Sequence, residues 1–165
     1  MFTFEEISAE LSLSNGSLIW RHGRKHAPQY GGMAAGCLDK EGYVVFSFKR
    51  KQLRAHRVVW LLPYGKWPTR HLDHINGNKA DNRIENLREA TCSQNGGNRR
   101  PDKGRRFKGV RRVPSGRFVA TCNAKYVGSF DSEEEAARAY DKRAAELFGE
   151  FANLNFGGHQ LARQS

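Results

Sequence analysis

Cysteine is scarce in this chain of 165 residues, and no C-x-x-C pair occurs. The three cysteines, Cys37, Cys92 and Cys122, are odd in number and widely spaced, so neither a disulfide framework nor a zinc knuckle is expected, and we predict three free thiols. No apolar stretch approaches the roughly 18 residues of a membrane span, and the first residues, MFTFEEISAE, are acidic where a secretion signal would be basic. These absences predict a soluble, intracellular protein.

Acidic residues are also in short supply. The chain has 17 Asp and Glu against 28 Lys and Arg, which gives a formal charge of +11 and a pI near 10.0. A strongly basic protein favours a polyanionic partner, so we expect nucleic acid first and a membrane surface only second. The length permits one ordinary domain or two small ones and excludes a large multi-layer enzyme.

The segment NRRPDKGRR at 98–106 divides the chain, because it is polar, basic and free of large apolar side chains. It predicts a first domain at residues 1–98, a basic linker at 99–106 and a second domain at 107–165. The basic side chains of the linker, Arg105 and Arg106 among them, either remain solvated or lie along DNA phosphates. Composition does not separate these two alternatives.

The first domain begins with short strands. Residues 18–20 and 43–48 are expected as strands, the second because its apolar side chains alternate along the chain. The compact apolar run HRVVWLLPY at 56–64 ends at Pro63 and Gly65 and predicts a short buried helix. His56 lies in this run, and we interpret it as a hydrogen-bonded core histidine and not as a ligand.

Residues 70–98 are crowded with His, Asp and Asn that packing does not require. Leu72 and Ile75 predict a strand that carries Asp73 and His74, followed by a turn at 76–77 and a return segment at 84–87. The sequence TCSQ at 91–94 fits a capping box, which places Asn95 in the first turns of a helix. The expected order is strand, loop, strand, helix.

Phosphodiester hydrolysis requires a base that deprotonates water, a cation that offsets the charge on the phosphate, and a fixed geometry between them. Three side chains in this segment can meet these requirements. Asp73 and Asn95 form a sparse pair of hard oxygen ligands that suits one Mg²⁺ or Mn²⁺ ion and disfavours zinc. His74 is the expected general base, with His71 as its main rival, because histidine is largely neutral near neutral pH. Asn86 is expected in the intervening loop, where it would brace the backbone around His74.

The motifs D-H-I-N-G-N-K at 73–79, N-R-I-E-N-L at 82–87 and S-Q-N at 93–95 resemble those of phage HNH endonucleases, particularly the homing enzymes. The resemblance covers about residues 18–100 and implies a ββα-metal fold acting on double-stranded DNA. It also implies that Asp73 and Asn95 bind the metal, that His74 is the general base and that Asn86 holds the histidine loop.

The section 107–156 predicts three strands and one helix. The segments FKGVRRV, RFVATCN and KYVGSF are separated by turns at 114–116 and 123–124. Asp131 and Ser132 precede three glutamates, and this pattern predicts a second capping box at the start of a helix. The apolar positions from Ala136 to Phe148 recur at helical spacing. One helix is therefore expected to lie across a three-stranded antiparallel sheet, and Gly149 is expected to end it.

The motifs F-K-G-V-R, G-R-F-V-A, Y-V-G-S-F-D, E-E-A-A-R-A-Y-D and N-L-N-F resemble the Apetala-two/ethylene-response-factor type DNA-binding domain. In that family the sheet enters the major groove, which implies DNA contacts from Lys108, Arg111, Arg117, Thr121 and Tyr126. The chain departs from the plant pattern at several strand positions, among them Val113, Ser115 and Asn123, so the plant target sequence is not implied.

Together these observations predict an α+β protein, with a ββα-metal nuclease domain followed by a three-stranded sheet packed on one helix. The leading hypothesis is a free-standing, homing-type phage endonuclease that acts on DNA in the host cytoplasm during infection and has no membrane partner. A non-catalytic DNA-binding regulator that retains the nuclease scaffold is the alternative from another class. A phage packaging or repair nuclease would share the chemistry and differ in its target.

Overall fold

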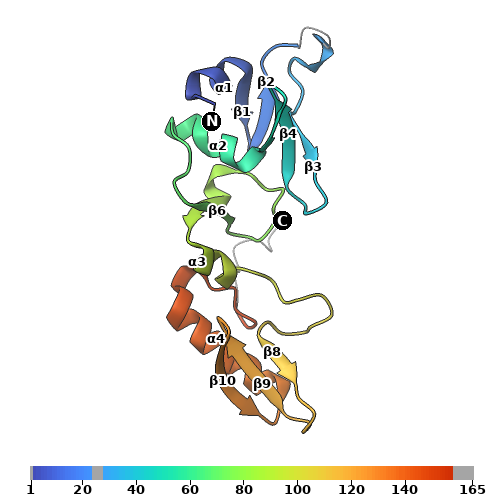
Figure 1. Ribbon diagram of the computed structural model, residues 1–165, viewed down its shortest axis with the longest axis vertical. Coiled ribbons are helices and arrows are strands. Elements are labelled where there is room, and N and C mark those ends of the chain that lie inside the picture. Colours follow the sequence, from blue (N-terminus) through green and yellow to red (C-terminus); the bar gives the residue numbers. More distant parts are fainter. Residues whose placement is uncertain (1, 24–27, 158–165) are drawn as a thin grey trace. The chain divides into compact units, whose positions relative to one another are not determined.

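The computed structural model describes residues 2–23 and 28–157, and its contacts divide the chain into two compact units, Met1–Glu89 and Ala90–Ser165. Met1 and residues 158–165, at the outer ends of the two predicted domains, lie outside the described part. The elements are short helices and small antiparallel sheets, so the predicted α+β class is confirmed (Figure 1). Within the described ranges no helix is long and apolar enough to cross a membrane.

The described residues of the first unit form three small sheets and two α-helices. Helix α1 (Phe4–Glu10) precedes the hairpin of β1 (Leu11–Ser14) and β2 (Ser17–Trp20), and the 3₁₀ turn η1 is Pro28–Tyr30. A second sheet has the order β3 (Cys37–Leu38), β4 (Val44–Phe48) and β5 (Lys51–Arg54), all antiparallel. It leads directly into α2 (Ala55–Tyr64), which confirms the predicted buried helix. The third sheet pairs β6 (His71–His74) with β7 (Leu87–Ala90), after the 3₁₀ turn η2 (Ile84–Asn86).

The core of the first unit lies between α1, α2 and the first two sheets. Helix α2 ends at Gly65, whose φ of 67° lies in the left-handed region that favours glycine. Burial of one aliphatic side chain stabilises a fold by about 1.5–3 kcal/mol, so the buried side chains of α2 hold this helix firmly against the strands. The largest fully buried side chains of this core are Ile7, Leu11, Leu18, Val58, Val59 and Leu61.

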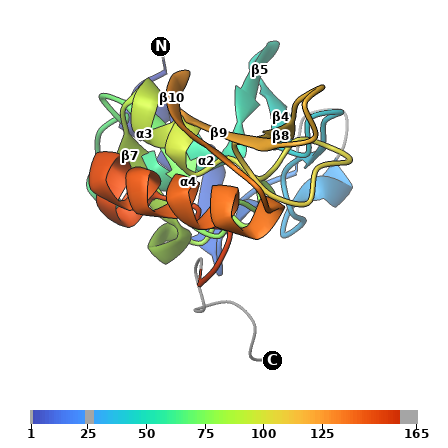
Figure 2. The same ribbon diagram turned by 90° about the horizontal axis from the view of Figure 1, so that it is seen from below.

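The second unit contains α3 (Cys92–Gly97), three strands, α4 (Glu133–Phe148) and the 3₁₀ turn η3 (Gly149–Phe151). Strands β8 (Val110–Arg112), β9 (Phe118–Cys122) and β10 (Lys125–Phe130) form an antiparallel sheet with β9 in the centre. Helix α4 packs across one face of this sheet, as Figure 2 shows, and Ala120, Ala136 and Tyr140 are buried between them. The predicted three-stranded sheet on one helix is therefore confirmed.

Local signals in the second unit behave as the sequence predicts, with one difference. Both capping boxes form, at Thr91 for α3 and at Ser132 for α4. The β9–β10 turn places Asn123 and Ala124 at φ values of 50° and 58°, as a tight hairpin turn requires. Strand β8 begins only at Val110, because Gly109 has a φ of 73° and interrupts the extended backbone that was predicted from residue 107.

The three cysteines are free thiols, as predicted. Cys37 and Cys92 are exposed, whereas Cys122 is buried beneath α4 in the core of the second unit. Burial raises the pKa of the Cys122 thiol, so this side chain behaves as a small apolar core residue.

Candidate active site

Strand β6 carries Asp73 and His74 as neighbouring buried side chains, each 5% exposed. Successive residues of a strand point to opposite faces, so the two side chains contact different groups. His71, the alternative base, is exposed at the start of the same strand. The structure therefore distinguishes the two histidines by burial, which the sequence did not.

His74 is held by an amide and by two rings. Its Nε2 lies 3.0 Å from Oδ1 of Asn82, and an amide oxygen only accepts, so Nε2 carries the ring hydrogen and Nδ1 the lone pair. The His74 ring packs edge-on against His56, with centroids 5.2 Å apart, and lies 6.1 Å from Tyr43. Burial lowers the pKa of His74, although Asn82 and the Asp73 carboxylate act in the opposite direction. A neutral imidazole is the form that can accept a proton.

His56 projects from α2 toward His74 and is 5% exposed. Its burial was predicted, but its Nδ1 has no hydrogen-bond partner in the described part of the chain. Burial, together with electrostatic interactions with His74, Arg54 and Arg57, lowers the pKa of His56 to about 3. His56 is therefore neutral over the whole physiological range.

Asp73 forms an ion pair with Arg88 of β7 that the sequence analysis did not identify. Arg88 Nε donates to Asp73 Oδ2 at 3.0 Å, and Nη2 lies 2.9 Å from the same oxygen. Their side chains are only 13% and 6% exposed. Arg88 directly follows the N-R-I-E-N-L motif, but only the pairing of β7 with β6 brings it to Asp73.

Asn86 holds the loop between the two strands. Its Oδ1 accepts from the backbone of Asn76 at 3.0 Å, and its Nδ2 donates to Asn76 Oδ1 at 3.1 Å and to the Asp81 carbonyl at 2.7 Å. The backbone of Ile75 also donates to the Asn86 carbonyl at 2.9 Å. The buried side chain of Asn86 thus holds the loop that follows His74 at two points, Asn76 and Asp81.

Asn95 lies on α3, in the second unit. The helix is held there by its C-terminal end, where Lys108 Nζ donates to the carbonyls of Gly96 and Gly97 at 3.4 and 2.5 Å. The backbone of Asn153 donates to Gly97 at 3.0 Å, and Gly97 packs so closely against Phe148 that a Cβ there would lie 2.6 Å from the ring. The structure therefore brings Asp73, His74 and Asn86 together in the first unit, and places Asn95 in the second.

The side chains near His74 suit a hard divalent cation better than zinc. Among the residues that the structure describes, no three His, Cys, Asp or Glu side chains gather as a metal cluster. Asp73 instead offers a buried carboxylate whose Oδ2 contacts Arg88, and a carboxylate has enough lone pairs to hold a cation as well. A sparse set of oxygen donors leaves coordination positions for water and phosphate, as Mg²⁺ requires.

Three of the residues expected to contact DNA share one face of the C-terminal sheet. Ala120 and Cys122 point into the core against α4, so the alternate positions of β9, including Thr121, point to the opposite face. Tyr126 is paired with Thr121 across β9 and β10 and is 68% exposed. Arg111 of β8 is exposed on the same face and makes no ion pair within the described ranges.

The remaining basic residues of this prediction have partners inside the second unit. Lys108 is half-buried against α3, and burial lowers its pKa to about 8. Arg117 pairs with Asp131 at 3.2 Å, and Arg106 pairs with Glu134 at 2.7 Å. Arg105 donates to the carbonyl of Val110 at 2.8 Å. Arg111 and Tyr126 are thus the exposed predicted contacts on the face opposite α4 that make no ion pair within the described residues.

Comparison with known proteins identifies both parts of the chain. The family model described as HNH endonuclease matches residues 53–96. An uncharacterized HNH endonuclease of Acanthamoeba polyphaga mimivirus is 36% identical over 124 residues, which cover 72% of this chain and 65% of that protein. No solved structure matches the chain.

Plant transcription factors are similar to another part. An ethylene-responsive transcription factor of Arabidopsis thaliana is 39% identical over 88 residues, covering 50% of this chain and 26% of that protein. Ethylene-responsive transcription factor 3 of Nicotiana tabacum is 47% identical over 57 residues, covering 31% of this chain and 25% of that protein. The chain therefore spans less than two thirds of the viral relative and about a quarter of the plant relatives. One part of it matches the HNH endonuclease family model, and a region of it is similar to ethylene-responsive transcription factors.

Proposed function

We propose that this chain, which carries an HNH endonuclease domain and an ethylene-response-factor-like region, is a metal-dependent DNA endonuclease that hydrolyses phosphodiester bonds. The observation that carries the proposal is that β6 buries a neutral His74 and Asp73 at consecutive positions. The order of β6, β7 and α3 along the chain is the order of a ββα-metal fold, to which we assign this segment.

His74 acts as the general base. Asn82 holds its Nε2 hydrogen, so Nδ1 accepts the proton of the attacking water. The hydrogen bonds of Asn86 keep the loop after His74 in one conformation, which preserves the direction of the imidazole lone pair. Ring contacts with His56 and Tyr43 restrict the same imidazole from its other sides.

Asp73 and Asn95 would hold one Mg²⁺ or Mn²⁺ ion. When bound, this ion would offset the charge that develops on the scissile phosphate and its leaving oxygen. Arg88 orients the Asp73 carboxylate, so that its remaining lone pairs are available.

The C-terminal sheet recognises the target. Its face opposite α4 presents Arg111, Thr121 and Tyr126, and an arginine on a strand can bond two acceptors of one guanine in the major groove. A nuclease site that grips mainly one phosphate reads little sequence, so positional information must come from such contacts. A homing-type role for a phage-encoded enzyme is the biological setting that we favour.

The test is the nicking of supercoiled plasmid DNA by the full chain with Mg²⁺. We expect His74→Ala to reduce the rate by about 10²–10⁴-fold while DNA binding is retained, because general-base removal costs that much and removes no phosphate contact. The matched control, His71→Ala, should cut like the parent, and EDTA should stop both. Absence of nicking by the parent, with DNA binding intact, would instead indicate a non-catalytic DNA-binding regulator.

A further inference from the structure

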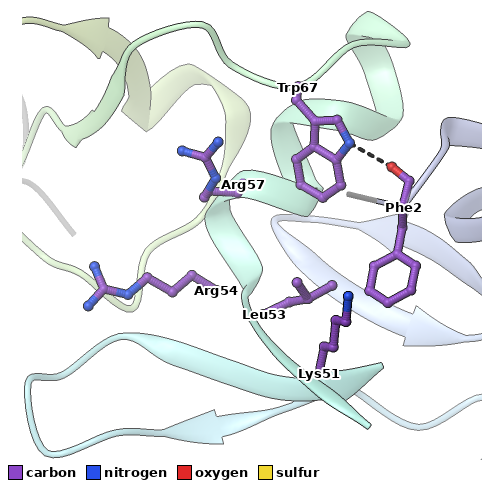
Figure 3. Close-up of a pocket in the computed structure, with 6 residues that line it drawn as sticks. All are labelled: Phe2, Lys51, Leu53, Arg54, Arg57 and Trp67. Atoms are coloured by element: carbon purple, nitrogen blue, oxygen red, sulfur yellow. Dashed lines mark hydrogen bonds between the residues drawn. The ribbon is translucent and has the colours of Figure 1, made fainter. Parts of the chain in front are cut away.

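A small cavity in the first unit has no role in the mechanism described above. Its volume is about 190 Å³, and Figure 3 shows the six side chains that line it, namely Phe2, Lys51, Leu53, Arg54, Arg57 and Trp67. The indole of Trp67 is fixed, because its Nε1 donates to the Phe2 carbonyl at 2.8 Å. Strand β5, the start of α2 and the segment after α2 all contribute to this cavity.

The cavity combines apolar walls with positive charge. Phe2, Leu53 and Trp67 form the apolar part, and no carboxylate lines it. Of the three cations, Arg54 bonds Glu41 at 3.1 Å, whereas Lys51 and Arg57 make no ion pair in the part of the chain that the structure describes. A fitting ligand therefore has a flat apolar ring and an anionic group attached to it.

We propose that this cavity binds a single unpaired nucleotide of the DNA substrate, an inference that rests on the proposed function. The base would stack on Trp67, and its phosphate would contact Arg57 and Lys51, since base stacking on aromatic side chains and phosphate contacts by Lys and Arg are the usual means of holding single strands. The cavity is smaller than the roughly 300–1,000 Å³ of ordinary ligand pockets, so it suits one ring system and not a base pair. A base must leave the duplex stack to enter it.

The cavity and His74, the proposed general base, both contact the first turn of helix α2. Helix α2 carries His56, whose ring contacts His74, and the next residue, Arg57, which lines the cavity. Adjacent helical residues are separated by about 100° of rotation and about 1.5 Å of rise, so the two side chains leave neighbouring parts of the same turn. A nucleotide held at Arg57 would therefore belong to the DNA near the scissile phosphate.

The experiment compares a short duplex that contains one bulged 2-aminopurine nucleotide with the fully paired duplex of the same sequence. The full chain binds each of them in EDTA, which prevents hydrolysis. We expect the bulged duplex to bind roughly 5- to 150-fold more tightly, the range that stacking of one base supplies. We also expect the protein to quench the 2-aminopurine fluorescence.

Trp67→Ala should abolish both the preference and the quenching, and Arg57→Gln should weaken binding of the bulged duplex. Trp67→Phe should retain the preference, and Lys40→Gln, which removes an exposed charge outside the cavity, should change nothing. Thermal unfolding would show whether Trp67→Ala is folded, and Arg57→Gln tests the same site without removing a large side chain.

Equal affinity of the parent for the two duplexes would overturn the proposal, and so would a preference that survives both Trp67→Ala and Arg57→Gln. Binding in EDTA does not depend on cleavage, whereas plasmid nicking with Mg²⁺ does. Failure of the cavity proposal and failure of the proposed nuclease function would therefore appear in different measurements.

Discussion

The guanidinium of Arg88 contacts the carboxylate of Asp73 through two of its nitrogens, with Nε 3.0 Å and Nη2 2.9 Å from Oδ2. The pair joins the two strands that flank the histidine loop, and both side chains are largely buried. It combines two roles, because it holds the proposed metal ligand in place and neutralises a charge that would otherwise be costly to bury.

Breaking this pair should destabilise the protein more than breaking a comparable pair whose arginine is exposed. We expect Arg88→Met to lower the free energy of unfolding by about 3–5 kcal/mol, because a buried carboxylate loses its ion pair with the guanidinium. The matched control is Arg83→Met, which removes a 2.8 Å pair between the more exposed Arg83 and Asp81 and should have a much smaller effect. Urea denaturation of the two variants measures the difference, and equal losses would contradict the structural role of the Asp73–Arg88 pair.

The proposed metal ligands can be tested by titration with Mg²⁺. We expect Asp73→Asn and Asn95→Ala each to raise the Mg²⁺ concentration required for half-maximal nicking by at least about tenfold, since loss of even a supporting contact can weaken a metal site that much. Asp102→Ala removes an exposed carboxylate in the second unit and serves as the control. Unchanged titration curves for both ligand variants would disprove the assignment.

His56 predicts a pH dependence of stability. Its pKa is about 3 in the folded protein and near 6.5 in the unfolded chain, so the unfolded state binds the extra proton as the pH falls. The contribution of a neutral His56 is thus complete above about pH 6.5 and is lost between pH 6.5 and pH 3, by at most about 1.4 kcal/mol per pH unit. Urea denaturation of His56→Leu should show a weaker dependence across this range than the parent. The exposed His71→Leu should retain the dependence of the parent.

Arg111 and the linker should affect DNA binding differently. Arg111→Ala should weaken binding to the preferred site by about 1–3 kcal/mol and reduce the preference over random DNA, as expected for loss of a guanine contact. Lys103→Ala should weaken binding to all sequences alike and lower the salt slope by about one. Lys103 is the better linker probe, because Arg105 has a contact within the second unit that its removal would disturb. An equal effect of Arg111→Ala on both kinds of DNA would rule out base recognition by Arg111.

The contacts of α3 predict the result of deleting residues 99–165. A helix of six residues is not stable alone, and the deletion removes Lys108, Phe148 and Asn153, which hold its C-terminal end. We expect the shortened chain to lose metal-dependent nicking as well as its preference for one DNA sequence. Nicking at the parental rate by the truncated chain would show that α3 does not need these contacts.

The local elements around the site could be predicted because their signals are local. The capping boxes at Thr91 and Ser132 involve residues three positions apart, so the sequence alone determined where both helices begin. The motif at 73–79 likewise indicated which histidine carries an acidic neighbour, and the family comparison agrees with the domain that it implied.

Tertiary structure decided how these elements meet. The spacing of Asp73 and Arg88 does not reveal their ion pair, which depends on the register of β6 against β7, and the ring contact of His56 with His74 depends on how α2 packs. Lys108 illustrates the same limit. The resemblance of its motif implied a DNA contact, and what the sequence did not reveal is that the second unit also places its ammonium at the carbonyl end of α3. Such contacts join residues far apart in the chain, and only the packing of apolar faces brings them within bonding distance.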